Sequence, residues 1–165
     1  MGKRDHFSFF FDQMLNKMAG VAAFLIAYLS VSISVAVILR EFKIEIIWMF
    51  EVTEYSLLWL TFLAAPWVLR DESHIKMDLI LSTFSPKKQA FLNSLTSLIG
   101  TIICLILAFF GFKVTWDYFQ TGYFLHTVMA PPIYPILIVI PLGFLMLFIQ
   151  FIRRTVKYYK EWRSF

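Results

Sequence analysis

The sequence predicts an all-α integral membrane protein with four transmembrane helices, and three observations lead to that prediction. Hydrophobic residues make up 59% of the 165 residues, charged residues only 16%, and 19 residues are phenylalanine. A soluble domain has about 25% charged residues and could not bury this much apolar surface in its own core. The charges also separate long uncharged runs, each close to the length of a bilayer crossing.

The first span is predicted over residues 18–39, an uncharged run between Lys17 and Arg40. This run has 22 residues, which is enough for one crossing at ~20 residues. It is longer than the ~7–15 apolar residues of a secretory signal peptide, and no small-residue cleavage site follows it. We therefore expect an uncleaved helix.

The second span begins after a stretch in which charged and apolar residues alternate, from Arg40 to Glu54. Such mixing predicts a short amphipathic helix lying in the outer interface. The alternative is a solvated loop with aromatic anchors. Because the uncharged run 55–69 is too short for a crossing, the second helix must extend back to Glu51, which predicts a span over 51–69.

The third and fourth spans follow from the remaining uncharged runs. Residues 89–112 form one clear span, whereas the run 118–152 is too long for a single helix. Three prolines between 131 and 135 interrupt it, which places the fourth span at 133–152. A further proline, Pro141, falls inside that helix and predicts a kink, because proline leaves a backbone carbonyl without its helical partner.

The connections are short, so the whole chain, residues 1–165, is predicted to be one four-helix transmembrane domain. Lys and Arg number 12 in the two terminal segments and the second connection, against 3 in the first and third connections. The positive-inside rule then places both termini in the cytoplasm. Topology also explains the net charge of +4 better than nucleic-acid binding does, and we expect no nucleic-acid partner.

Composition excludes several kinds of chemistry. The six glycines are too scattered to form a phosphate-binding loop, which argues against an ATP-driven motor. The single cysteine, Cys104, allows no intrachain disulfide, and the three histidines lack metal-ligand spacing. We therefore expect no enzyme activity, no catalytic residues, no metal and no cofactor.

Two carboxylates break the apolar pattern at the edge of the second span. Glu51 and Glu54 are three residues apart and so share one face of the predicted helix. An ionised carboxylate within the hydrocarbon core costs about 3 kcal/mol or more. One hypothesis is that the pair binds an ion or a proton; the other is interfacial exposure or contact with a partner subunit.

The polar residues fall into a pattern that resembles a known family. The pattern comprises Trp48-x-x-Glu51, Leu58-Trp59, Arg70-x-x-x-His74-Ile75-x-x-Asp78 and Ile140-Pro141-Leu142-Gly143-Phe144. It is similar to the signature of the small, DctQ-like membrane subunit of tripartite ATP-independent periplasmic (TRAP) transporters. The chain length, the four spans and the inward termini are also typical of that family.

The resemblance implies a division of labour within a sodium-coupled importer of the bacterial inner membrane. A large membrane subunit holds the substrate and sodium sites and moves as an elevator. A periplasmic binding protein delivers a small organic acid, such as a dicarboxylate, sialic acid or another carboxylate. The small subunit would be a fixed brace, paired about 1:1 with the large subunit, and would not itself bind substrate.

The resemblance also gives candidate residues for contacts with the large subunit or with lipid headgroups. These are Trp48, Glu51, Trp59, Arg70, His74 and Asp78. We add Arg40 and Glu54 from the mixed segment. The small residues Gly100, Gly111 and Ser94 are predicted to form close helix contacts.

Two other functions fit the sequence less well. A self-sufficient four-helix cation or drug transporter, acting as an oligomer, needs a carboxylate deep within a span, but the central parts of all four spans lack charge. A membrane enzyme or electron carrier would need paired histidines or cysteines in its helices, and the sequence has neither.

Overall fold

The computed structural model describes the backbone of residues 3–44, 46–71 and 86–164, and the side chains of 8–44, 46–71 and 87–163. Within these residues the chain forms four long helices and one short one. They are α1 (Lys3–Glu41), α2 (Ile47–Asp71), α3 (Pro86–Thr121), α4 (Tyr134–Leu137) and α5 (Val139–Ser164). The regions Ser8–Glu41, Ile47–Asp71, Lys87–Thr121 and Tyr134–Arg163 are long and apolar enough to cross a membrane. The prediction of an all-α chain with four such helices is confirmed.

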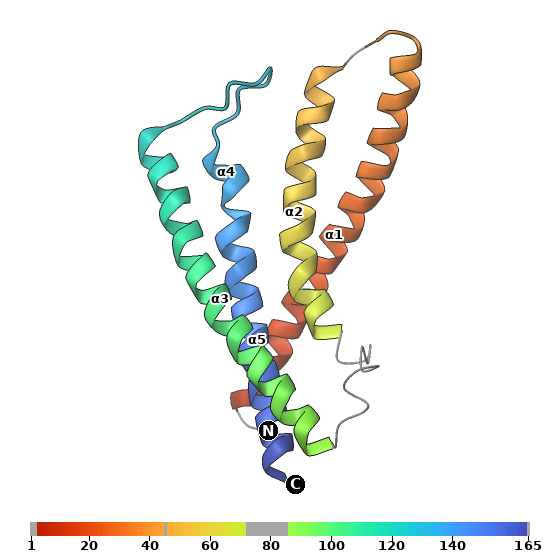
Figure 1. Cartoon of the computed structure of the whole chain (residues 1–165). Helices are drawn as coiled ribbons and strands as arrows, with labels where there is room; N and C mark the ends of the chain where they lie inside the picture. The colour runs from red at the N-terminus through yellow and green to blue at the C-terminus, as the bar shows by residue number, and fades with distance from the viewer. Residues whose placement is uncertain (1–2, 45, 72–85, 165) are drawn as a thin grey trace.

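The long helices are arranged as two antiparallel pairs, α1 with α2 and α3 with α5 (Figure 1). The pairs are joined mainly through α2 and α5. They lie close together at the end that carries both termini and diverge toward the opposite end (Figure 1). We call these the terminal end and the distal end of the bundle.

Residues 42–44, directly after α1, form a turn. The amides of Phe42 and Lys43 donate to the carbonyls of Leu39 and Arg40 at 3.0 and 2.9 Å, and Lys43 has a positive φ of 58°. The amphipathic helix expected here is absent from the described residues of the segment, 42–44 and 46. The reason is that α1 continues to Glu41 and α2 already begins at Ile47, which leaves too few residues for a separate helix.

The fourth crossing is interrupted near its start, as the proline inside it predicts. Pro141 has no N–H to offer the carbonyl of Leu137, four residues earlier, and α4 ends at Leu137. Helix α5 then begins at Val139, and the amide of Leu142 makes only a long hydrogen bond of 3.4 Å to the carbonyl of Ile138. The break therefore follows from the proline.

Glycines allow α5 to approach two of its neighbours closely. A Cβ at Gly143 would lie 2.7 Å from Cβ of Phe62 on α2, and one at Gly100 would lie 2.8 Å from the ring of Phe151 on α5. At Gly111 the nearest atoms would be 3.5 Å away, an ordinary contact distance. The predicted close contact is thus confirmed at Gly100, whereas Gly111 is less crowded, and the role of Ser94 stays a prediction.

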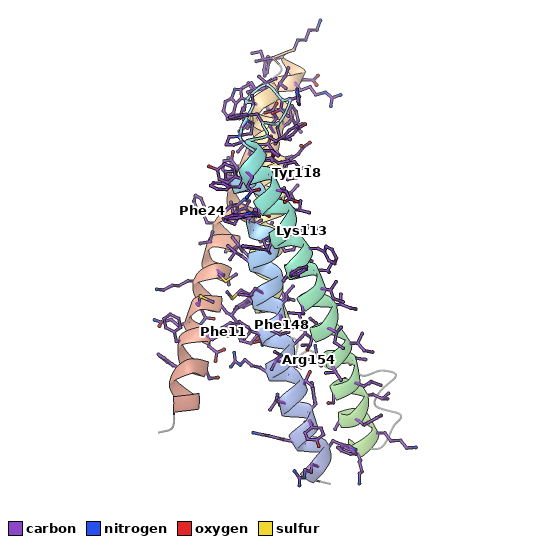
Figure 2. All side chains as sticks on the ribbon, turned by 90° about the vertical axis from the view of Figure 1, so that its left-hand side faces the viewer. Phe11, Phe24, Lys113, Tyr118, Phe148 and Arg154 are labelled. Carbon is purple, nitrogen blue, oxygen red and sulfur yellow. The ribbon has the colours of Figure 1, made fainter. Side chains whose placement is uncertain are left out.

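Most large apolar side chains lie on the outside of the bundle. Phe24 on α1 is 70% exposed and Phe109 on α3 is 67% exposed. Phe24 stands out from α1 in Figure 2, as do many side chains along α3. A surface of this kind suits a lipid or protein environment rather than water.

Candidate functional site

Polar side chains hold the bundle together at its terminal end. We call this group the Asp12 cluster, and its described members are Ser8, Asp12, Asn16, Arg70, Gln150 and Arg153. They come from three helices, α1, α2 and α5. The cluster therefore joins both helical pairs at the level where they lie closest.

The strongest contact in the cluster is between Asp12 and Arg153. Nη1 of Arg153 donates to Oδ1 of Asp12 at 2.7 Å, and Nη2 donates to Oδ2 at 3.2 Å. Nη2 also donates to Oγ of Ser8 at 2.7 Å, and the guanidinium lies 5.3 Å from the ring centre of Phe11. Because two parallel charge-assisted hydrogen bonds fix distance and orientation, this pair sets the position of α5 against α1.

Arg70 adds α2 to the same cluster. Its Nη2 donates to Oδ1 of Asn16 at 2.6 Å, and its Nη1 donates to the backbone carbonyl of Asp12 at 3.2 Å. The same Nη1 lies 4.0 Å from Oδ1 of Asp12. The sequence predicts Arg70 as a contact for a partner or lipid; the structure places it against residues of its own chain.

The rest of this cluster was not predicted from the sequence. Ser8, Asp12 and Asn16 follow one another at intervals of four residues. Residues four apart lie on the same face of a helix, so the spacing indicates a polar stripe on the start of α1. Arg153 was counted only as part of a basic C-terminal segment. Its pairing with a residue 141 positions away leaves no local signal in the sequence.

At the distal end, Glu51 binds the loop between α3 and α4. Its Oε1 accepts a hydrogen bond from the amide of Val128 at 2.8 Å, and its Oε2 accepts one from the amide of Met129 at 3.1 Å. Glu51 is only 9% exposed. The carboxylate thus satisfies two backbone donors and links α2 to a segment 77 residues further along the chain.

The loop that Glu51 holds has an ordered backbone of its own. We call residues 122–133 the distal loop. The amide of Leu125 donates to the carbonyl of Pro131 at 3.0 Å, and that of Ala130 donates to Thr127 at 3.1 Å. Ala130 has a φ of 43°, a left-handed conformation that is unfavourable for alanine. The bonds to Glu51 help to compensate for this strain.

The remaining predicted site residues are not brought together. Glu54 is exposed although Glu51, one turn earlier, is buried. Trp48 and Trp59 are exposed on α2, and Arg40 is exposed at the end of α1. His74 and Asp78 lie outside the described residues.

The described residues contain no group of three or more His, Cys, Asp and Glu side chains that could hold a metal ion. The Asp12 cluster and the contact of Glu51 with the distal loop instead link parts of the bundle. Each joins segments from different helical pairs through charged hydrogen bonds, so each can keep the pairs in a fixed relation.

One comparison with known proteins assigns a family. The family model of the tripartite ATP-independent periplasmic transporters, DctQ component, matches residues 29–161. No curated protein and no solved structure matches significantly. The matched region contains the last third of α1, all of α2 to α4 and most of α5. The chain is therefore a multi-pass membrane protein of the DctQ family, the small component of TRAP transporters, which works with a large membrane subunit and a periplasmic binding protein.

Proposed function

We propose that this chain is the stationary scaffold of a sodium-coupled importer of small organic acids in a bacterial inner membrane. The large membrane subunit would carry substrate and sodium and move as an elevator, while this chain keeps its place beside it. A periplasmic binding protein would deliver the acid. In this scheme the small subunit binds no substrate, and both of its termini are in the cytoplasm.

The observation that carries the proposal is that the carboxylates at both ends of the bundle are bound by other groups of the same chain. Asp12 is bound by Arg153 and contacted by Arg70, and Glu51 is bound by two backbone amides. A transport site needs groups that can exchange partners with an ion or substrate. Carboxylates fixed in this way instead favour a rigid frame.

The uncharged middle of the bundle supports the same proposal. Residues 18–39, 55–69, 89–112 and 133–152 contain no Asp, Glu, Lys or Arg. Polar or ionisable residues inside a membrane usually mark the path of an ion or substrate. The exposed apolar side chains of α1 and α3 are instead suited to packing against lipid or the large subunit.

We also propose that the exposed residues of α2 and of the first turn contact the large subunit or lipid headgroups. These residues are Arg40, Trp48, Glu54 and Trp59. Aromatic and arginine side chains are enriched at both protein interfaces and membrane interfaces. His74 and Asp78 remain proposed contacts on the strength of the family resemblance alone.

Purification from the native membrane tests this function. The full chain, tagged and extracted in mild detergent, should copurify with a much larger polytopic partner in about a 1:1 ratio, and its deletion should abolish both assembly and organic-acid uptake. Complementation with the untagged chain is the control. Recovery of the chain only as a homo-oligomer would contradict the proposal and favour the small four-helix transporter.

A further inference from the structure

A cavity of about 320 Å³ lies beside the Asp12 cluster, between the last turn of α2 and the second half of α5. Its lining consists of Leu69, Arg70, Gln150, Arg153, Arg154, Lys157 and Tyr158. The volume is within the usual range for small-ligand pockets. Nothing in the scaffold role requires such a cavity.

The lining is strongly cationic. Four of its side chains are those of Arg or Lys, and among the described residues that line it none is acidic. Asp12 offsets part of this charge from one side, through Arg153 and Arg70. Glu161 lies one turn beyond Lys157 on α5 and is not among the lining residues. The cavity is therefore a place where an anion would be stabilised.

Two of the cations lie near the ring of the same tyrosine. The guanidinium of Arg154 lies 5.7 Å from the ring centre of Tyr158, and Nζ of Lys157 lies 6.0 Å from it. Residues 154, 157 and 158 share one face of a helix because of their spacing. The ring contacts hold the two flexible cations near the cavity.

The position of the cavity along the helices indicates the source of the anion. Arg70 is the first charged residue after the uncharged run 55–69 of α2, and Arg153 is the first after the uncharged run of α5. Charges in these places mark the level of the lipid headgroups. Arg154 lies low on α5, toward the terminal end, whereas Lys113 and Tyr118 lie toward the distal end of α3 (Figure 2).

We propose that this cavity binds the phosphate group of an anionic phospholipid, with Arg154 and Lys157 as its principal donors. The acyl chains would run along the apolar surfaces of α2 and α5 next to it. Basic pockets between transmembrane helices are known to bind such headgroups. The inference is independent of the scaffold role, since a lipid can bind here whether or not the large subunit moves against this chain.

Native mass spectrometry of lipid adducts tests the proposal with the full chain, together with any partner that copurifies. The probe is phosphatidylglycerol, titrated in parallel with zwitterionic phosphatidylcholine. The double variant Arg154→Gln/Lys157→Gln leaves the Asp12–Arg153 pair in place. The matched control, Lys160→Gln/Arg163→Gln, removes the same charge from the same helix at residues that do not line the cavity.

The wild type and the control should bind phosphatidylglycerol equally and in preference to phosphatidylcholine. The cavity variant should bind it about 30-fold more weakly, since each basic group contributes about a factor of five near an anionic lipid. Equal loss in both double variants, or no loss in the cavity variant, would overturn the proposal. The variant Arg154→Lys/Lys157→Arg keeps the charges and should restore binding, which separates a lost site from a misfolded chain.

A competition with inorganic phosphate tests whether the bound phosphate group belongs to a lipid or to a soluble phosphate. If the ligand is a lipid, inorganic phosphate at the same concentration should leave the phosphatidylglycerol adduct in place. Equally tight binding of inorganic phosphate, abolished by the same cavity variant, would overturn the assignment to a lipid and identify a site for a soluble phosphate.

Discussion

At the terminal end of the bundle, the side chain of Asp12 is contacted by two arginines, whereas at the distal end the side chain of Glu51 is bound by two backbone amides. Both carboxylates link segments that are far apart in the sequence. The terminal link joins three packed helices. The distal link joins one helix to a loop, at the end where the helical pairs diverge (Figure 1).

This difference indicates which end of the bundle holds the two helical pairs together. Loss of the terminal link would leave two arginines beside each other without their carboxylate, and like charges repel. Loss of the distal link would leave two loop amides that water can partly satisfy. We therefore expect the terminal end to determine the stability of the bundle and the distal end to determine the order of one loop.

The largest effect is expected from Asp12→Ala. It removes the bidentate partner of Arg153 and a nearby carboxylate from Arg70. Because these groups are partly exposed, the free energy of unfolding should fall by about 2–3 kcal/mol, less than for a fully buried pair. Chemical denaturation in detergent measures it. Asp117→Ala, at an exposed acidic residue of α3, is the control and should change stability little; equal losses would contradict the comparison.

A somewhat smaller effect is expected from Gly143→Ala, which probes the joint between the two helical pairs. The new methyl group would lie 2.7 Å from Cβ of Phe62, so α2 and α5 must move apart at a cost of about 1–3 kcal/mol. The matched variant is Gly20→Ala, where no atom lies within 4 Å. It should be neutral or stabilising, because alanine favours a helix more than glycine does. A neutral Gly143→Ala would show that the joint is loosely packed.

The smallest effect on stability is expected from Glu51→Gln. Glutamine keeps one acceptor oxygen and loses the charge, so the hydrogen bonds to Val128 and Met129 weaken by about 1 kcal/mol in total. Hydrogen exchange of these two amides should become about five-fold faster while exchange in α3 and α5 stays unchanged. Glu54→Gln is the control, since Glu54 is exposed. Unchanged exchange at both amides would mean that Glu51 does not order the loop.

The sequence was sufficient for the features that depend on short-range patterns. Uncharged runs located all four membrane-spanning helices, and Pro141 located the break before α5. The helices extend well beyond the predicted spans, because their polar ends continue outside the apolar stretch. For the segment after α1 the sequence left an amphipathic helix and a solvated loop as alternatives, since alternating charges describe a surface segment without fixing its backbone.

The features that the sequence did not predict are pairings between distant residues. Glu51 was singled out as costly to bury, but its partners are backbone amides, which every residue except proline can offer. Asp12 was not singled out from the sequence, and Arg153 was counted only among the basic residues of the C-terminal segment. Only the folded arrangement of α1 against α5 shows that they belong together.

The central claim is that this chain supports transport without carrying the ion. The most direct test is the double variant Glu51→Gln/Glu54→Gln in the assembled transporter, with Glu51→Asp/Glu54→Asp as the charge-preserving control. Organic-acid uptake is measured per assembled complex at a series of sodium concentrations and pH values. We predict that the dependence of uptake on sodium and protons is the same as in the wild type. A shifted dependence in the glutamine variant alone, with assembly intact, would contradict the account and make these carboxylates part of an ion site.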